Sequence, residues 1–303
     1  MAKEDVVSWT GGGVPSDELK AEIRAAIAEM KLARPTVVLF RGEISMEGEL
    51  EECRKHLPTV EYRTLVPPYA TVIPRYSALP NYQELEAELR LNGSRLANTY
   101  AQHKWIADLM DWGGPHGVLS GLTPMSWPNW SRLPEGAYIV KGRTNSRKER
   151  WGTHMFAPTL ADVPAVAMRL LDDGLIRDQG VVVRQYVPLK KLMEGLNELP
   201  IVNEWRTFWW TRDDGVPEHL GHGFYWKASH PEAEPLALFP PEALELATEA
   251  ARLVAPHVRF FVLDVAERAD GGWIVVEVND GGMSGLCGVP AATLYANLAR
   301  VLE

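Results

Sequence analysis

Two carboxylates and one amide stand close together near the C-terminal end of the sequence, and such a set of oxygen ligands can bind a metal ion. They are Asp264, Glu277 and Asn279, within FFVLDVAERADGGWIVVEVNDGG (260–282). This stretch predicts two apolar strands joined by a short turn. Because side chains alternate between the two faces of a strand, Glu277 and Asn279 share one face. The opposite face is apolar and must belong to the core, which sets the register.

The register of this hairpin decides whether the two carboxylates meet. Like charges directly opposed in a sheet are destabilising, so something must neutralise them. Mg²⁺ prefers oxygen ligands of this kind beside nucleotide phosphates, whereas Arg or Lys side chains would form plain salt bridges. Spacing alone leaves both interpretations open. The interpretation that brings the carboxylates together leaves residues 269–272 as the connection and pairs Asp264 with Glu277, Ala266 with Val275 and Arg268 with Trp273.

A basic segment earlier in the chain could contact phosphates. In YIVKGRTNSRKERWGTH (138–154), Lys141 ends an apolar strand and a polar turn with three further cations follows, Arg143, Arg147 and Lys148. Such a turn could close over phosphates, with Lys141 as a fixed charge and backbone N–H groups as donors. The alternative is a solvated hairpin tip. The sequence has no Walker A motif and no GxGxxG motif, so a nucleotide site at this position would belong to another fold.

The elements that must position these residues are strands and helices in alternation. Apolar residues 36–40, a helical pattern over 46–57 and strand-like residues 60–66 predict a small α/β unit, preceded by a helix over 16–33. After about residue 137, the strands come mostly as hairpins with helices between them. This pattern favours α+β lobes with antiparallel sheets over one doubly wound parallel sheet.

Composition limits the class of protein. The 303 residues are 46% apolar, which is ample for a large core, and their formal net charge of −9 argues against a nucleic-acid partner. Two cysteines, Cys53 and Cys287, give neither a disulfide framework nor zinc spacing. The first residues lack an apolar signal core, and no run approaches 18 apolar residues. We therefore expect a soluble, cytoplasmic protein with no membrane partner.

The strand lysine, the strand VVVRQYVPL (181–189) and the hairpin that ends in Glu277-x-Asn279 together resemble the ATP-grasp superfamily. Residues 100–303 are most similar to a bacterial and phage-associated clade whose substrates are largely unassigned. The resemblance implies an α+β fold in which two lobes clasp ATP between antiparallel sheets. It also implies a small N-terminal α/β domain over 1–100, a central lobe with a flap hairpin over 101–188, and a C-terminal lobe with the metal site over 189–303.

The resemblance implies a set of nucleotide and metal ligands in this chain. Mg²⁺, as one or two ions with Mn²⁺ as an alternative, would bind Asp264, Glu277 and Asn279. The phosphates of ATP would contact Lys141, Arg143 and Lys104, although Lys104 could instead be a solvated helix residue. Adenine would lie at the hinge formed by Gln185, Tyr186 and Val187. The family often carries Glu near this hinge, whereas this chain has RQYV.

The resemblance also implies residues for the reacting groups. Arg206, with Lys141, would stabilise the transferring phosphoryl group, and Glu204 shares the face of Arg206 and joins the nucleotide-binding set. The alternative for both is a cross-strand ion pair. The glycines of DGGMSGL (280–286) could let backbone N–H groups approach a substrate carboxylate near Ser284, or could simply form a tight turn. Arg75 is a candidate for holding an anionic group.

The activity implied by the resemblance is that of an ATP-dependent carboxylate–amine ligase, forming amide or peptide-type bonds. It would act through an acyl phosphate and release ADP and phosphate. The alternatives are a small-molecule kinase on the same fold and a nucleotide-binding regulator without turnover. We expect small-molecule carboxylate and amine substrates, although a macromolecular acceptor such as a protein terminus is a further option. A homodimer is compatible with these expectations.

Overall fold

The computed structural model describes residues 16–18, 20–22, 34–41, 48–112, 125–126 and 133–303. The chain divides into two compact units, Met1–Pro35 and Thr36–Glu303, and the second unit holds all of the sheets. The helix expected over 16–33 lies mostly outside the described residues. Among the described helices, none is long and apolar enough to cross a membrane.

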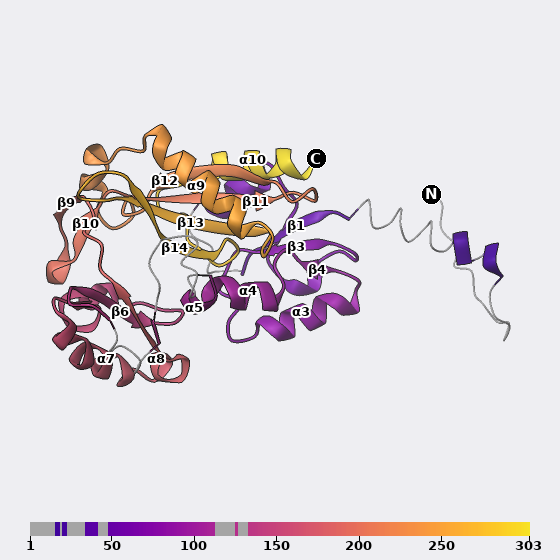
Figure 1. Cartoon of the computed structure of the whole chain (residues 1–303). Coiled ribbons are helices and arrows are strands. Elements are labelled where there is room, and N and C mark those ends of the chain that lie inside the picture. Colours follow the sequence, from indigo (N-terminus) through magenta and orange to yellow (C-terminus); the bar gives the residue numbers. More distant parts are fainter. Residues whose placement is uncertain (1–15, 19, 23–33, 42–47, 113–124, 127–132) are drawn as a thin grey trace. The chain divides into compact units, whose positions relative to one another are not determined.

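The second unit begins with a small parallel sheet (Figure 1). Its order is β2-β1-β3-β4, and helices α2 (Glu49–Arg54) and α3 (Tyr82–Leu91) belong to this region. The strand expected over 60–66 is wrong beyond its start, because the chain turns into a 3₁₀ helix at Arg63–Leu65. The four parallel strands are β1 (Thr36–Leu39), β2 (Thr59–Val60), β3 (Thr71–Pro74) and β4 (Arg95–Leu96).

A central antiparallel sheet comes next, in the order β5-β8-β6-β7. Helices α6 (Trp151–His154), α7 (Val163–Leu171) and α8 (Gly174–Gln179) belong to this lobe, and α7 buries its apolar side against the sheet. The buried cluster includes Tyr138 and Val140 of β6. The described strands are β5 (Met125–Ser126), β6 (Tyr138–Gly142), β7 (Phe156–Ala157) and β8 (Val181–Gln185).

The C-terminal sheet has the order β12-β11-β13-β14, with antiparallel neighbours throughout. A separate hairpin, β9 (Lys191–Glu194) and β10 (Pro200–Val202), precedes it. The helices that pack on the sheet are α4 (Tyr100–Ala107), α5 (Leu109–Trp112), α9 (Pro241–Val254) and α10 (Ala291–Leu302). The four strands are β11 (Glu204–Thr211), β12 (Pro217–Phe224), β13 (Phe260–Glu267) and β14 (Trp273–Asp280).

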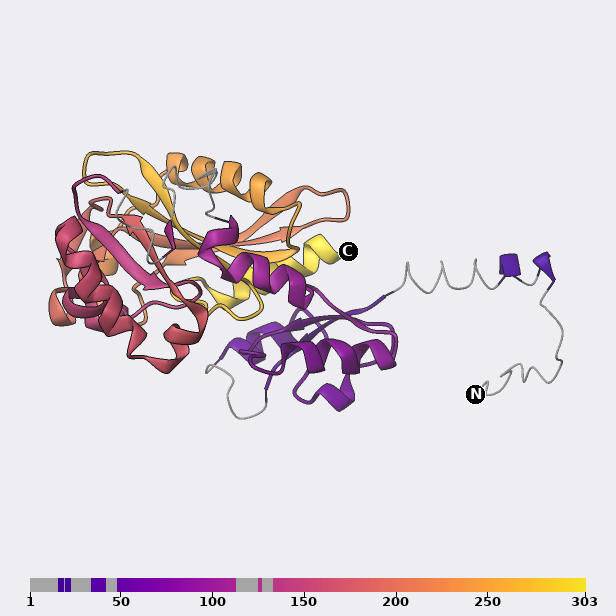
Figure 2. The same cartoon turned by 60° about the horizontal axis from the view of Figure 1, so that its bottom comes forward.

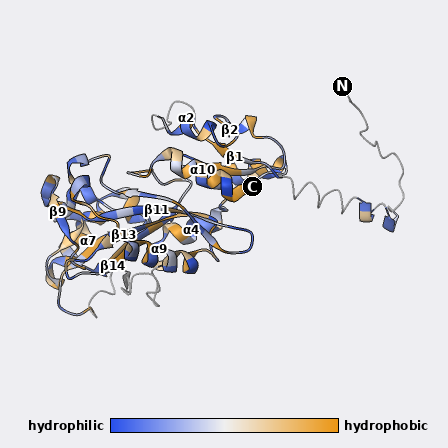
Figure 3. Ribbon diagram, turned by 90° about the horizontal axis from the view of Figure 1, so that it is seen from above, coloured by the Kyte–Doolittle hydropathy of each residue, from blue (hydrophilic) through white to orange (hydrophobic). Residues whose placement is uncertain are grey.

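Each face of the C-terminal sheet is covered by helices, which Figure 2 shows beside it. Trp209 and Trp210 are successive residues of β11, so they point to opposite faces, and both are buried. Trp209 packs with α9, α4 and α5, whose small and apolar residues face the sheet. Figure 3 shows that α9 carries both hydrophilic and hydrophobic residues along its length, as an amphipathic helix should.

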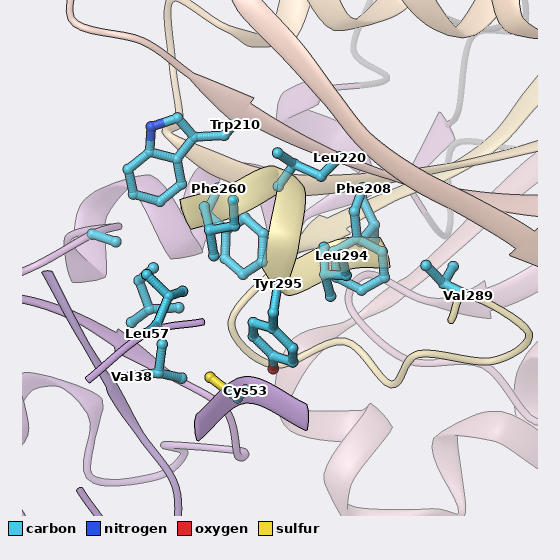
Figure 4. Packing of buried hydrophobic residues seen from close by; sticks show 14 of the residues in the cluster. Val38, Cys53, Leu57, Phe208, Trp210, Leu220, Phe260, Val289, Leu294 and Tyr295 are labelled. Carbon is cyan, nitrogen blue, oxygen red and sulfur yellow. The ribbon is translucent and has the colours of Figure 1, made fainter. Parts of the chain in front are cut away.

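The other face joins the C-terminal sheet to the parallel sheet. Leu294 and Tyr295 of α10 lie between apolar residues of the sheet, such as Phe208 and Phe260, and residues of the parallel unit, such as Cys53 (Figure 4). One continuous core therefore fixes the parallel unit against the strands that carry the acidic residues.

The hairpin at the C-terminal end has the expected central pair, with Asp264 opposite Glu277. Beyond this pair the expected register is wrong. A β-bulge leaves Val276 as an extra residue on β14, so Val265 faces Val275 and the remaining pairs are shifted by one. Ala266 consequently pairs with Ile274, and Glu267 rather than Arg268 pairs with Trp273.

The three sheets fall within the domain ranges expected from the sequence, 1–100, 101–188 and 189–303. One pair of helices departs from that division. Helices α4 and α5 lie in the range of the central lobe, yet Ile106, Leu109 and Trp112 pack in the core of the C-terminal sheet. The limits of the three domains therefore stay a prediction.

Candidate nucleotide and metal site

A pocket lies between the central sheet and the C-terminal lobe. Its walls come from β6 and the segment after it, from the end of β8, from the β10 region and from β14. Much of the lining is apolar, including Ile139, Met155, Leu199, Val202 and Ile274. Charged residues occupy the same pocket, and they are Lys141, Lys148, Arg184, Glu204 and Glu277.

The charged residues reach one another across the two lobes. Lys141 Nζ of β6 donates to Glu277 Oε1 of β14 at 2.8 Å. Lys148 lies over the ring of Tyr225 at 4.3 Å, donates to its hydroxyl at 3.1 Å and stands 3.8 Å from Glu204 Oε1. Two lysines of the central lobe thus approach two carboxylates of the C-terminal lobe.

The two carboxylates have opposite pKa shifts. Burial raises the pKa of Glu204 to about 7; Lys148 opposes this rise and the neighbouring carboxylates add to it. Glu204 is 2% exposed, and its Oε1 has no hydrogen-bond partner among the described residues. Burial would also raise the pKa of Glu277, but Lys141 and Lys148 outweigh burial and hold that pKa well below its usual range. Glu204 is therefore a buried acid without a sufficient partner, which is the kind of group a ligand can satisfy.

Asp264 does not line this pocket. It is fully buried, and its Oδ1 and Oδ2 accept hydrogen bonds from Nε and Nη2 of Arg206 at 2.9 and 2.8 Å. Arg206 also donates to the carbonyl of Gly285 at 2.9 Å and lies over Tyr225. The cross-strand ion pair considered for Arg206 is thus present, but with Asp264 rather than with Glu204.

Asn279 lies two residues beyond Glu277 on β14 and is partly exposed, opposite Val262. In the residues that the structure describes, no group of three His, Cys, Asp or Glu side chains could hold a metal ion. The expected ligand set has two acids and one amide, and each acid is paired with a cation. Salt bridges therefore neutralise both acids in the protein by itself, and the metal assignment stays a prediction.

The expected hinge residues Gln185, Tyr186 and Val187 all line the pocket. Tyr186 donates its backbone N–H to the carbonyl of Ala137 at 2.9 Å, so this donor is used within the protein. Within the described part of the chain, no hydrogen bond occupies the backbone N–H or C=O of Val187. The Tyr186 ring packs edge-on against Phe156. Val187 is consequently the hinge residue with backbone groups available to a base.

Two other expected phosphate contacts lie elsewhere. Lys104 is exposed on α4 and does not line the pocket. Arg143 pairs with Asp108, donating from Nε at 3.1 Å, and it also lies outside the pocket lining. The structure thus gives neither residue a place beside the charged pocket.

Arg75 and Ser284 are brought together, but by contacts within the protein. The side chain of Arg75 is 3% exposed and donates to Glu49 at 2.7 Å, to the carbonyl of Ser284 at 2.9 Å and to the carbonyl of Gly281. The hydroxyl of Ser284 donates to the carbonyl of Asp280 at 2.8 Å. Arg75 therefore holds the loop that follows β14, and its guanidinium has no donor directed at a ligand.

The expected ligand set lacks two cations of the pocket, Lys148 and Arg184. Lys148 belongs to the basic turn after β6, where the run of charges did not indicate which residue points inward. Arg184 directly precedes the hinge on β8 and donates to the carbonyl of Val276 at 3.2 Å. A lone arginine at the end of the apolar run VVV was the signal that could have identified it.

The fold and the charged pocket define an ATP-grasp protein. Residues 127–298, more than half of the chain, match the model of an ATP-grasp domain family, the third family of its clade, and the chain belongs to this family. The resemblance to the ATP-grasp superfamily and the α+β fold class are thereby confirmed. ATP-grasp proteins are mostly ligases, which supports an ATP-dependent ligase in broad terms.

Solved ATP-grasp structures share this fold. D-cycloserine synthetase DcsG is 14% identical, with a TM-score of 0.54 over 88% of this chain and 100% of that chain. A RimK domain ATP-grasp protein from Sphaerobacter thermophilus DSM 20745 is 16% identical, with a TM-score of 0.51 over 88% and 100%. The ATP-grasp ligase PsnB is 12% identical, with a TM-score of 0.50 over 89% and 99%. No curated protein matches the chain.

Proposed function

We propose that this protein is an ATP-dependent carboxylate–amine ligase that acts through an acyl phosphate and releases ADP and phosphate. The observation that carries the proposal is a single pocket with an apolar part and a charged part, shared by two lobes. Ile139, Met155 and Leu199 suit the faces of a base, and Lys141 and Lys148 suit phosphates. The pocket thus offers each part of ATP a matching surface.

The residues of the pocket fit a nucleotide on two further counts. The backbone groups of Val187 are available for the polar edge of adenine, next to the apolar wall. Glu204 Oε1 is buried without a hydrogen-bond partner among the described residues, and a ribose hydroxyl or a bound cation would satisfy it. The structure of PsnB was solved with Mg and ADP, which supports the same pair of ligands in this protein.

The donor set also fits Mg²⁺ by its chemistry. Asp264, Glu277 and Asn279 provide two carboxylates and an amide oxygen, which are ligands that Mg²⁺ prefers. Binding would require Arg206 and Lys141 to release the two carboxylates, which they neutralise in the chain alone. When bound, Mg²⁺ supplies positive charge beside the phosphates. The released Lys141 and Arg206 are then free to contact phosphate oxygens.

The protein side of the proposed reaction is positioning and charge neutralisation. A substrate carboxylate attacks the γ-phosphorus of ATP and forms an acyl phosphate, ADP leaves, and an amine then displaces phosphate. Lys141 and Arg206 offset the negative charge that develops during phosphoryl transfer. Lys148, from the turn above the pocket, would exclude water together with the aromatic residues that it contacts, Tyr225 and Trp226.

The loop after β14 is the proposed contact for the substrate carboxylate. Its carbonyls at Gly281, Ser284 and Gly285 accept hydrogen bonds from Arg75 and Arg206. Within the described residues, the backbone N–H groups of 284–288 have no hydrogen-bond acceptor. A run of free N–H groups beside Arg206 suits an anion. We therefore assign Arg75 to positioning this loop rather than to direct contact with substrate.

Product analysis tests the proposal. The full-length protein is incubated with ATP, Mg²⁺ and pools of amino acids and small carboxylates, and nucleotides, phosphate and new amides are measured by mass spectrometry. A ligase gives ADP, free phosphate and a condensed product. Phosphate retained on a substrate identifies a kinase instead. Glu277→Gln is expected to abolish turnover while the protein stays folded, and unchanged turnover in this variant removes the metal assignment.

A further inference from the structure

A second pocket lies within the parallel sheet unit, and none of its lining residues belongs to the nucleotide pocket. It is bounded by the segments that directly follow β1, β2 and β3 and by the start of α3. Its polar residues are Arg41, Tyr62, Arg63, Tyr76, Ser77 and Asn81. These residues are far apart in the sequence, and the carboxyl ends of three parallel strands bring them together.

The position of this pocket results from the strand order. The chain runs from β1 to β2 on one side and then crosses to β3 on the other side of β1, giving the order β2-β1-β3-β4. The connections after β1 and β3 therefore diverge and leave a crevice at the carboxyl ends of these strands. Ligands of open parallel sheets bind in crevices of this kind.

The charges in the pocket favour an anion. Among the described residues, Arg41 has no ion-pair partner. Arg63 pairs with Glu88 at 2.9 Å, but both side chains are about half exposed, so solvent screens the pair. The acid in the lining, Glu61, is already paired with Arg54. Two guanidinium groups are therefore available in the pocket, and its carboxylate is neutralised.

The hydroxyl of Tyr76 lies near both guanidinium groups. Burial raises the pKa of Tyr76, and Arg41 and Arg63 are the main groups that oppose this rise, which places both cations around the phenol. The phenol and the two arginines together offer hydrogen-bond donors of the type that bind carboxylate and phosphate oxygens.

The N-terminus of α3 faces the same crevice. Asn81 is the N-cap of this ten-residue helix, and its side chain makes no capping hydrogen bond. The N–H groups of the first helical turn have no partner within a helix and carry partial positive charge. This end of α3 adds to the arginines, which supply the stronger attraction.

We propose that this pocket binds the phosphate or carboxylate group of a small molecule, with Arg41 and Arg63 as its principal ligands. The site is distinct from the nucleotide pocket, so it is independent of ligase activity. Its wall is also connected to the loop after β14, because Arg75 donates to the carbonyl of Ser284 and the N–H of Ala78 contacts Met283 Sδ at 3.3 Å. A molecule bound in this pocket therefore touches the segment that holds the proposed acceptor loop.

Thermal unfolding of the full-length protein, without nucleotide, tests the site. Orthophosphate and succinate are titrated separately at constant ionic strength, and a saturable rise of the unfolding midpoint is expected for at least one of them. The one with the lower half-saturating concentration identifies a phosphate-bearing or a carboxylate-bearing ligand. The absence of a saturable rise with both anions overturns the proposal.

Variants locate the bound anion. Arg41→Gln with Arg63→Gln is expected to raise the half-saturating concentration at least about tenfold, since each guanidinium makes charge-assisted hydrogen bonds. Arg41→Glu, a single change at an exposed residue, is expected to abolish the rise and serves if the double variant does not fold. Arg90→Gln, on the same helix but outside the pocket, is the matched control and should change nothing.

A variant of the nucleotide pocket separates the two sites. Lys148→Met removes a cation from that pocket and should leave the effect of the anion intact. If Lys148→Met abolishes the rise while the Arg41 and Arg63 variants retain it, the anion binds in the nucleotide pocket and the proposal is wrong.

Discussion

Lys141 of β6 donates to Glu277 of β14 at 2.8 Å, so one charged contact joins the central sheet to the C-terminal sheet. Across the hairpin Glu277 opposes Asp264, and Asp264 in turn pairs with Arg206. The four side chains form a row of charges in which two acids lie between two cations. The row is balanced without any ligand, so a nucleotide and its metal ion must exchange partners with it rather than enter an empty charged site.

Removal of the strand lysine should separate its catalytic role from its structural one. Lys141→Met removes the charge proposed to contact phosphates, and loss of one such preorganised group lowers turnover by about 100- to 1,000-fold. The measurement is the rate of ADP release at saturating ATP. Lys191→Met is the control, because Lys191 is about half exposed and pairs only with Glu194. Turnover of Lys141→Met within twofold of the unchanged protein would contradict the role.

The pair of Arg206 and Asp264 should behave as a buried ion pair. Asp264 is fully buried, so Asp264→Asn leaves the Arg206 guanidinium without its countercharge, at a cost of roughly 3–5 kcal/mol in the free energy of unfolding. Arg206→Met leaves the carboxylate alone and should cost a similar amount. Urea denaturation of both variants and of the double variant measures their coupling. Losses that simply add in the double variant would mean that the two side chains do not stabilise each other.

This pair also decides which acid is the better probe of the metal ion. Glu277 has a side chain that is 20% exposed, so Glu277→Gln should perturb folding less than Asp264→Asn. We expect Mg²⁺ with ADP to raise the unfolding midpoint more than ADP with EDTA, because a ligand that binds only the folded state stabilises it. In Glu277→Gln the difference between the two conditions should vanish. A difference of the same size in this variant would place the metal ion elsewhere.

The sequence predicted the elements of the site better than its contacts. Alternating apolar residues located the hairpin, and the need to bury one face placed Asp264 opposite Glu277. The bulge at Val276 could not be predicted, because one extra residue leaves the local pattern unchanged and depends on the neighbouring strand. Its effect is that Ile274 and Val276 line the pocket, although the sequence placed them in the core.

Partners across lobes were the other limit of prediction. The basic turn after Lys141 was recognised as a group of charges, but only the fold shows that Lys148 packs on Tyr225 while Arg143 turns to Asp108. Likewise, the choice of Asp264 rather than Glu204 as the partner of Arg206 depends on the pairing of β11 with β13. Sequence spacing defines which residues share a strand face, whereas these partners depend on how strands and lobes meet.

A pair of histidines on β12 should make folding sensitive to acid. His219 stacks against His222, and within the described residues neither His219 Nε2 nor His222 Nδ1 has a hydrogen-bond partner. Burial, with a contribution from His222, lowers the pKa of His219 from 6.5 to about 4. Between these values the unfolded chain binds a proton that the folded protein does not, so the free energy of unfolding falls as the pH drops from 6.5 towards 4.

The size of this effect depends on the shift of the His219 pKa. A difference of this size in pKa corresponds to at most about 3 kcal/mol, and the partial exposure of His219 reduces it. Urea denaturation at about pH 7 and about pH 5 measures it, and His219→Gln should flatten the difference between the two pH values. His56→Gln, at an exposed position, is the control for removal of a histidine. An unchanged pH dependence in His219→Gln means that other groups cause the acid sensitivity, because a glutamine side chain cannot take up the proton that destabilises the folded state.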